Sequence, residues 1–294
     1  MPKSARRSWL LPLLLLPLLG CSRSVVLNPA GDVARQQGDL IVVATVLMLI
    51  VIIPVIALTL FFAWRYRASN AKATYTPDWD HSIQLELVIW AVPLLIIIAL
   101  GAITWISTHT LDPYRPLDRI DATRAIPEGT RPLDVQVVAL DWKWLFIYPE
   151  QGIATVNELA APVDRPIRFK LTSATVMNAF YVPDLAGMIY TMPGMQTELN
   201  AVINKPGEYR GFSANYSGAG FSHMRFDYKA TSVADFDAWV AKTKAGGGAL
   251  NRINYLELAK PSEKHPVEMF GAVDPELYSK ILNLCVVEGQ PCMH

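Results

Sequence analysis

The sequence has no excess of charge of either sign. Its 294 residues include 26 Lys and Arg and 26 Asp and Glu, so the formal net charge is +0 at pH 7. Proteins that bind nucleic acid carry a basic surplus or a basic patch, so nucleic acid is not an expected partner. Hydrophobic residues instead make up 52% of the chain. The mean hydropathy of +0.25 exceeds that of an ordinary soluble domain, and the excess lies in the first third of the chain.

The first 20 residues are typical of a cleaved export signal. A basic start is followed by an apolar run from Trp9 to Leu19, which is shorter than the roughly 20 residues that a membrane-spanning helix needs. Leu18-Leu19-Gly20-Cys21 resembles the bacterial lipobox, in which the cysteine is lipidated and becomes the mature N-terminus. We expect residues 1–20 to be a lipoprotein signal peptide and Cys21 to be lipidated. An ordinary signal sequence with an incidental cysteine is the alternative.

Two apolar runs predict a stronger anchor than one lipid provides. Residues 40–64 and residues 85–108 are each long enough to cross a bilayer as a helix. A proline inside each run is tolerated where neighbouring helices satisfy the freed backbone groups, which favours a larger membrane complex. Three basic residues follow the first run, so we predict that loop 65–84 is cytoplasmic. Both chain ends, including the segment 21–39, are then predicted to face the periplasm.

Short β-rich runs separated by Pro and Gly follow from Asp112 onward. Apolar and polar residues alternate in part along these runs, at the period of strands with one buried face. Repeated short strands of this kind favour an antiparallel sandwich over a parallel α/β sheet. We predict a periplasmic β-sandwich at residues 112–230, with strands in four runs: Val135–Leu140, Ile167–Leu171, Thr197–Ile203 and Met224–Lys229.

Residues 231–294 are predicted to form a C-terminal helical arm. The run from Val233 to Lys242 places Phe236 and Trp239 on one helix face. This face either packs on the sandwich or serves a partner protein, and packing is the simpler use. The chain is thus predicted to be an α+β membrane protein in which a two-helix transmembrane hairpin leads into a β-sandwich and a helical arm.

Two cysteines remain near the C-terminus, Cys285 and Cys292. The oxidising side of the membrane permits a disulfide between them. Two free thiols in a frayed tail are the alternative, and the sequence does not decide between the two.

The order of these parts, together with one long motif, resembles subunit II of the haem-copper oxidases, and most strongly that of the ubiquinol-oxidising cytochrome bo type. The motif is Asp-Trp-Lys-Trp-Leu-Phe-Ile-Tyr-Pro-Glu-Gln-Gly-Ile-Ala-Thr-Val-Asn, from Asp141 to Asn157. The resemblance covers nearly the whole chain and implies a cupredoxin-like sandwich that sits over the catalytic subunit I. It continues through four shorter motifs: Val176–Phe180, Val182–Leu185, Met192–Thr197 and Ala214–Ser222.

The cytochrome c oxidase branch of this family holds a dinuclear copper centre in the sandwich. Its ligands follow a pattern of an upstream His and then Cys-x3-Cys-x3-His-x2-Met, and such soft donors suit copper. On this chain the pattern retains His223 but loses both thiolates, so we expect no metal in this chain. A mononuclear copper at His223 is the weaker alternative to a surface histidine. The lost ligand positions are Asn178, Asn215, Ala219 and Phe226.

Glu86 lies at the predicted cytoplasmic start of the second span. A carboxylate there is costly if it faces lipid and usually points toward protein, water or an ion path. A solvated acid favoured by the helix dipole is an equally simple interpretation of the sequence alone. The resemblance implies the first role, because the family places a Glu at this position at the entrance to the proton path that feeds subunit I.

The resemblance implies that electrons enter the complex elsewhere, from membrane ubiquinol at subunit I. None of the five histidines lies in the interior of a predicted span, where haem or copper ligands would be required. The chain is therefore expected to hold no cofactor and no catalytic residue. The haems and one copper are expected in subunit I, and Trp142 and Trp144 are expected to pack at the subunit interface.

The predicted protein is a structural subunit of a proton-pumping enzyme that oxidises ubiquinol and reduces oxygen to water. Its expected partners are subunit I, subunits III and IV, and membrane lipid. Its expected location is the bacterial inner membrane, with a lipid-anchored N-terminus, two spans and a large periplasmic domain. Two alternatives stay open, namely a subunit of a cytochrome c oxidase with a degenerate copper site, and a lipoprotein binding or chaperone module outside any oxidase.

Overall fold

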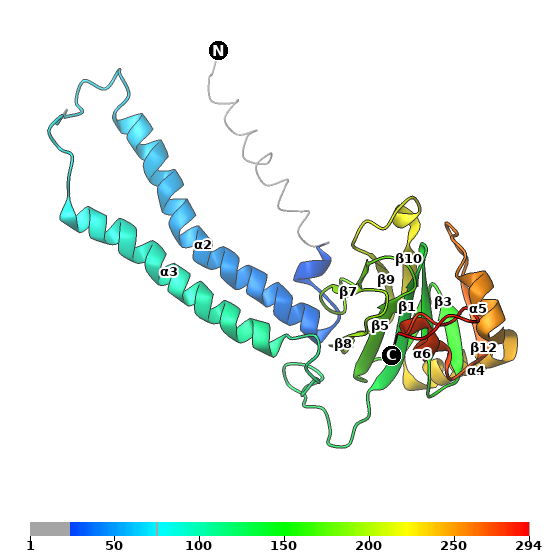
Figure 1. Cartoon of the computed structure of the whole chain (residues 1–294). Coiled ribbons are helices and arrows are strands. Elements are labelled where there is room, and N and C mark those ends of the chain that lie inside the picture. The colour runs from blue at the N-terminus through cyan, green and yellow to red at the C-terminus, as the bar shows by residue number, and fades with distance from the viewer. Residues whose placement is uncertain (1–23, 75, 294) are drawn as a thin grey trace, which may run out of the picture. The chain divides into compact units, whose positions relative to one another are not determined.

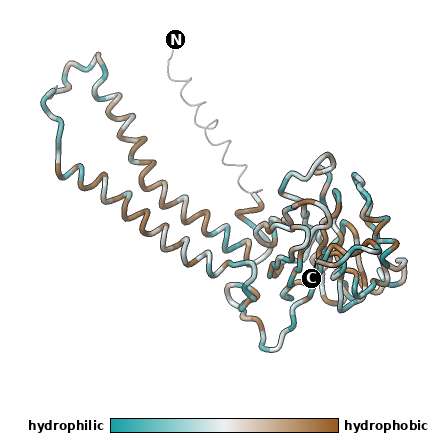
Figure 2. Tube along the Cα trace, viewed as in Figure 1, coloured by the Kyte–Doolittle hydropathy of each residue, from teal (hydrophilic) through white to brown (hydrophobic). Residues whose placement is uncertain are grey.

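The computed structural model describes residues 24–74 and 76–293, so the predicted signal peptide and Cys21 lie outside the described residues. Two long helices come first, α2 (Asp32–Arg65) and α3 (Ile83–Thr110). Figure 2 shows that most residues along both helices are hydrophobic. Both are long and apolar enough to cross a membrane, and the most apolar stretch of each has no buried residue within the chain. Their prolines, Pro54 and Pro93, lie inside the helices without ending them.

The chain divides into two compact units, of which one is the helical hairpin 39–112. Among the described residues, the other unit contains residues 113–293 together with residues 24–38. Within it, the short 3-10 helix η2 (Val25–Leu27) precedes α2. Gly31 forms a β-bridge with Ile203. The first turns of α2 are therefore part of the C-terminal domain, although sequence reasoning assigned residues 21–39 to a separate segment.

A buried ion pair fixes this part of α2. Asp32 is 2% exposed, and its Oδ2 atom accepts a hydrogen bond of 2.8 Å from Nε of Arg119. A second bond of 3.2 Å joins Arg119 Nη2 to Asp32 Oδ1. Gln36 donates a further bond to the same carboxylate. Because a buried charge is stable only when it is paired and hydrogen-bonded, the loop that carries Arg119 is held against the helix.

The C-terminal domain is built on two sheets, as Figure 1 shows. The larger sheet has seven strands in the order β11-β12-β3-β2-β1-β5-β8. Its strands are β1 (Leu133–Leu140), β2 (Lys143–Tyr148), β3 (Ile153–Val156), β5 (Ile167–Ser173), β8 (Thr197–Ala201), β11 (Gly248–Leu250) and β12 (Glu268–Val273). The four predicted strand runs overlap β1, β5 and β8 of this sheet and β10 (Arg225–Thr231) of the second sheet.

The smaller sheet has five strands in the order β4-β10-β9-β6-β7. They are β4 (Glu158–Pro162), β6 (Asn178–Tyr181), β7 (Ile189–Thr191), β9 (Gly207–Ser213) and β10 (Arg225–Thr231). Most strand pairs in the domain are antiparallel, as expected. Three pairs are parallel, because their strands are joined by connections that cross rather than by hairpins: β1 with β5, β4 with β10, and β11 with β12.

Aromatic side chains fill the space between the two sheets. Trp144 and Phe146 of β2 are 0% exposed. They meet Phe180 of β6 and Phe226 of β10, whose rings stack at 5.3 Å and 10°. We call these four residues the aromatic core. Burial of one such side chain contributes about 1.5–3 kcal/mol, so this cluster supplies much of the cohesion between the sheets.

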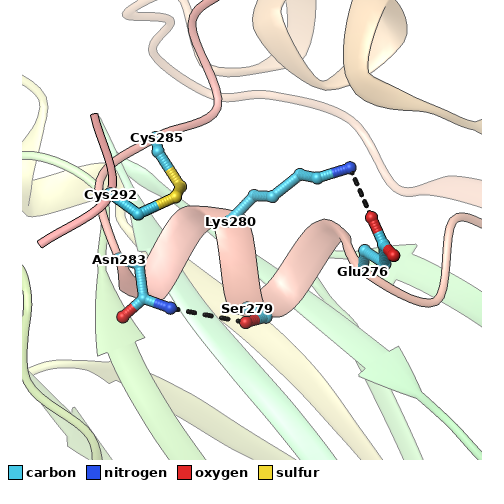
Figure 3. Close-up of a disulfide and its surroundings, with 6 residues drawn as sticks. All are labelled: Glu276, Ser279, Lys280, Asn283, Cys285 and Cys292. Atoms are coloured by element: carbon cyan, nitrogen blue, oxygen red, sulfur yellow. Dashed lines mark hydrogen bonds and ion pairs between the residues drawn. A yellow bond between two sulfur atoms is a disulfide. The ribbon is translucent and has the colours of Figure 1, made fainter. Parts of the chain in front are cut away.

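The C-terminal arm contains the expected helices and also two strands that sequence reasoning missed. Its helices are α4 (Val233–Gly246), α5 (Arg252–Leu258) and α6 (Leu277–Leu282). Strand β12 pairs with β3, so the arm extends the larger sheet. After α6, a disulfide joins Cys285 and Cys292 and closes a short loop (Figure 3). Of the two alternatives left open by the sequence, the structure contains the disulfide.

Lys143, a buried residue of β2, links the arm to the sandwich. The residue is 1% exposed, and its Nζ donates to the carbonyl of Lys260 at 2.8 Å and to Ser262 Oγ. Burial lowers the pKa of Lys143, and the carboxylates of Glu268 and Asp141 partly oppose this shift. The buried ammonium thus has partners from the segment that links α5 to β12, which satisfies its hydrogen-bonding needs.

We predict that Arg119→Gln destabilises the domain by about 2 kcal/mol, because it leaves the Asp32 carboxylate buried without its charged partner. Arg119 is itself 37% exposed in its side chain, which keeps the cost below that of a fully buried pair. Chemical unfolding of the detergent-solubilised chain measures the effect. Lys260→Gln is the matched control, since its ion pair with Glu257 is exposed on both sides, and a change within about 0.5 kcal/mol is expected. Equal stability of the two variants would contradict the prediction.

Candidate functional site

The five positions that match the copper ligands lie on the β6 end, the β9–β10 connection and β10. Asn178 begins β6, and Asn215 and Ala219 follow β9. His223 ends the 3-10 helix η3 (Phe221–His223), and Phe226 lies in β10. Hydrogen bonds from Ser213 and Asn215 link the end of β9 and the β9–β10 connection to the start of β6.

Asn178 occupies the position of the upstream histidine, and both ends of its amide are hydrogen-bonded. The residue is 1% exposed. Its Oδ1 accepts a 3.0 Å hydrogen bond from Ser213 Oγ, and its Nδ2 donates to the carbonyl of Val176 at 3.2 Å. Asn215 likewise donates its amide to the carbonyls of Met177 and Tyr216. Both side chains tie the loops to one another, which is a structural use of the amide group.

The last two positions of the pattern point in different directions. His223 is exposed, whereas Phe226 is 2% exposed and belongs to the aromatic core. A Cβ atom on Gly211 of β9 would collide with the Phe226 ring, so the ring lies flat over that glycine. Since alternate residues of a strand face opposite sides, β10 places position 226 inside the sandwich. The side chain at this position is a packing element here.

This donor set does not fit a dinuclear copper centre. The pattern needs two bridging thiolates, and Ala219 offers no donor atom while Asn215 offers an amide. Met224, beside His223, is 1% exposed, and its sulfur accepts from Ser217 Oγ at 4.0 Å. Within residues 24–74 and 76–293, no group of three or more His, Cys, Asp or Glu residues is arranged to hold a metal ion.

Trp142 covers the loop in which the cysteines would lie. It sits in the tight turn between β1 and β2 with a positive φ of 65°. Its indole Nε1 donates to the carbonyl of Ser217 at 3.0 Å. A Cβ atom at Gly220 would lie 2.5 Å from the indole ring, so only glycine permits this close approach. Trp142 thus packs against its own chain.

Trp144 corrects one sequence-based expectation. We expected it at a subunit interface, but it is 0% exposed and contacts Phe180 and Phe226. The two tryptophans differ in their surroundings because Trp142 lies in the turn before β2, whereas Trp144 lies within the strand. The sequence motif alone does not reveal that only the second tryptophan lies within the sheet.

Several connections at this end of the strands expose apolar side chains. Met177 and Tyr216 lie close together, because the amide of Asn215 reaches the carbonyls of both. Tyr216 is 76% exposed. Soluble surfaces rarely gather such residues without a use. We call the following residues the loop-end surface: Val176, Met177 and Tyr216.

Glu86 lies in the first turn of α3, in the helical hairpin. Ser82 caps this helix by accepting a hydrogen bond from the backbone N–H of Leu85. The Glu86 carboxylate lies 2.6 Å from Nδ1 of His81, with side-chain exposures of 45% and 60%. The carboxylate is thus held beside an imidazole at the open end of the helix. Sequence reasoning missed this partner, since a spacing of five residues across a helix start carries no periodic signal.

Two family models match the later part of the chain. Residues 134–231 match the model of the cytochrome c oxidase subunit II periplasmic domain. Residues 244–289 match the aromatic-rich motif model of the same oxidases. A crystal structure of the periplasmic domain of subunit II of cytochrome oxidase from Bradyrhizobium japonicum is similar over 38% of this chain and 94% of that chain, at 24% identity and a TM-score of 0.37.

Curated relatives match over most of their length. Subunit 2 of the cytochrome bo(3) ubiquinol oxidase of Pseudomonas putida is 51% identical over 93% of this chain and 84% of that protein. The corresponding subunit of Pseudomonas aeruginosa is 54% identical over 90% of this chain and 77% of that protein. Ubiquinol oxidase subunit 2 of Acetobacter aceti is 52% identical over 90% of this chain and 83% of that protein. The chain therefore belongs to the family of ubiquinol oxidase subunit 2, within the cytochrome c oxidase subunit II proteins.

Proposed function

We propose that this chain is a copper-free subunit II of a proton-pumping ubiquinol oxidase, which oxidises ubiquinol and reduces oxygen to water. The proposal rests on one observation: side chains at the positions that match copper ligands make structural contacts. Asn178 and Asn215 hold loops together, and Phe226 packs in the aromatic core. Relatives that share about half of the sequence are named as ubiquinol oxidase subunits, which supports the same class of electron donor.

In this proposal the chain contributes no redox centre and no catalytic residue. Electrons pass from ubiquinol to the haems and the copper of subunit I without entering the periplasmic domain. The apolar side chains of the loop-end surface are suited to contact other subunits, because burial of such residues drives association. The partners are subunit I, which carries the cofactors, and subunits III and IV.

The proposed location is the bacterial inner membrane. Residues 40–64 and 85–108 are the two spans, loop 65–84 faces the cytoplasm, and the domain 112–230 and the arm 231–294 face the periplasm. The basic residues that follow the first span support this orientation. Lipidation at Cys21, after removal of residues 1–20, adds a second attachment to the outer side of the membrane.

Glu86 is proposed as the entrance to a proton path into subunit I. Its carboxylate takes up a proton at the cytoplasmic end of α3 and passes it onward, and the His81 imidazole 2.6 Å away exchanges protons with it. Both side chains are partly exposed, so they are reached by water at the start of the path. A position at the helix start also favours the negative charge of the carboxylate.

We predict that Glu86→Gln slows ubiquinol oxidation by the purified complex on the order of tenfold, because proton transfer by a positioned side chain contributes at least that much. Assembly should be intact, as judged by the haem content of the preparation. Glu263→Gln is the control, since this exposed acid lies in the arm. Normal turnover in the Glu86 variant would refute the role of the carboxylate.

A second prediction concerns metal content and electron donor. The purified complex should oxidise ubiquinol but not reduced cytochrome c, and it should lack the near-infrared absorption of a dinuclear copper centre, because the domain has no thiolate to bridge two coppers. Optical spectroscopy together with metal analysis measures both. Two copper ions that remain bound to the periplasmic domain during purification would favour the cytochrome c oxidase alternative. A chain that purifies without a haem-bearing partner would instead favour a lipoprotein outside any oxidase.

A third prediction tests the proposed processing. Intact-mass measurement of the mature chain should give a mass that begins at Cys21 and includes attached lipid. Cys21→Ala should abolish the lipid mass, because no thiol remains to carry it. The two helices should still retain the variant in the membrane fraction, since each is long enough to span. An unmodified Cys21 in the wild-type protein would show that the signal is an ordinary one.

A further inference from the structure

The segment that joins α5 to β12, residues 259–267, is attached to the sandwich by polar groups. We call it the arm linker. None of its residues is buried, so apolar packing contributes little to its position. Asn157 Nδ2 donates a hydrogen bond of 2.8 Å to the carbonyl of His265. Lys143 Nζ donates to the carbonyl of Lys260 and to Ser262 Oγ. The attachment of the arm linker therefore depends on a small number of hydrogen bonds.

The hydrogen bonds at Ser262 select the protonation state of the neighbouring histidine. An ammonium group can only donate, so Ser262 Oγ accepts from Lys143. The same Oγ atom lies 3.1 Å from Nδ1 of His265. The hydroxyl proton of Ser262 is donated in this contact when Nδ1 is the acceptor, which leaves the ring neutral with its own proton on Nε2. A neutral ring therefore completes a chain of hydrogen bonds that begins at the ammonium group.

Protonation of His265 disrupts this chain. Nδ1 then carries a proton and becomes a donor, so His265 and Lys143 both direct N–H groups at Ser262 Oγ. A second positive charge also arises close to the ammonium of Lys143. Lys143 is 1% exposed and the side chain of His265 is 16% exposed. Because little water reaches either group, the repulsion between the two charges is weakly screened.

The charged groups that face the ring act in opposite directions. Burial and the Lys143 ammonium of β2 lower the pKa of His265, whereas the Glu268 carboxylate of β12 raises it. Glu268 Oε1 lies 3.2 Å from Nε2, but the Glu268 side chain is 42% exposed, so solvent weakens its attraction. Asp141, in the turn between β1 and β2, acts on Lys143. The net result is a pKa of His265 below its ordinary value of 6.5.

We propose that His265 is a pH-sensitive switch that holds the arm linker on the sandwich while its ring is neutral and releases the linker when the ring is protonated. The arm linker leads directly into β12, so its release also weakens the pairing of β12 with β3. The switch acts on the arm and needs neither the electron donor nor the proton path of the proposed function.

The direction of the pH dependence follows from the lowered pKa. A base whose pKa is lower in the attached state than in the released state favours release as protons are added. The arm linker is therefore fully attached above the ordinary histidine pKa of 6.5. Its attachment weakens as the pH falls from that value toward the lowered pKa of the attached state.

Hydrogen–deuterium exchange of the full chain in the detergent-solubilised complex tests the switch. Exchange times are scaled so that the intrinsic exchange is equal at every pH, and peptides from β1 serve as the internal reference. Between about pH 7.5 and about pH 5, the range in which histidine titrates, protection of residues 259–273 should fall several-fold while protection of β1 stays constant. Unchanged protection of residues 259–273 would overturn the proposal.

Two substitutions assign the response to the ring. His265→Gln replaces the imidazole by an amide that cannot be charged, so protection should no longer depend on pH in this range. His223→Gln is the matched control, since His223 is an exposed histidine of η3, and it should respond to pH as the wild type does. The same pH response in all three proteins would assign it to another group and overturn the proposal.

A third variant keeps the imidazole and changes its surroundings. Glu268→Gln removes the carboxylate that favours the protonated ring, so the midpoint of the loss of protection should move to lower pH. A purely structural role of Glu268 would instead lower protection equally at every pH. Glu128→Gln, an exposed acid in the loop before β1, is the control and should leave the midpoint in place. A midpoint that stays in place or rises in the Glu268 variant would overturn the proposal.

Discussion

The aromatic core is the constraint on which the rest of the domain depends. It joins β2 of one sheet to β6 and β10 of the other, and the loops that carry the former ligand positions leave from the ends of these same strands. With Phe226 inside and seated over Gly211, the end of β10 is committed to packing. A phenylalanine ring offers no donor atom to a metal, so the side chain at position 226 contributes packing alone.

Local pattern predicted much of the fold. The long apolar runs correspond to α2 and α3, and the four alternating runs correspond to β1, β5, β8 and β10. Burial of one face of a strand produces a regular alternation of apolar and polar residues, which the sequence shows. Strands β11 and β12 of the arm were missed, since partly exposed strands carry a weak pattern. The four predicted runs also left out β2, β3, β4, β6, β7 and β9. The start of α2 at Asp32 was missed as well. Its helical turns are stabilised by the contact with Arg119, which lies far along the chain.

The candidate site was predictable in identity but not in geometry. The spacing of the pattern predicts which positions correspond to the copper ligands, and in the structure hydrogen bonds link the β9–β10 connection to the start of β6. Which side chains face inward depends on register and on turns, as the different surroundings of Trp142 and Trp144 illustrate. The partner of Glu86 depends on how the chain enters α3, where His81 folds back on the first turn. Such contacts follow from backbone geometry that residue types alone do not encode.

The pairing of β12 with β3 has a consequence for biogenesis. Strand β3 is complete early in the sequence, whereas its neighbour is supplied by residues 268–273. Until the last part of the polypeptide has crossed the membrane, the hydrogen-bonding groups on one side of β3 have no strand beside them, and such an edge is prone to pair with other chains. Export and sheet completion are thus linked in time. A chain halted during secretion would expose the edge that the finished protein keeps covered.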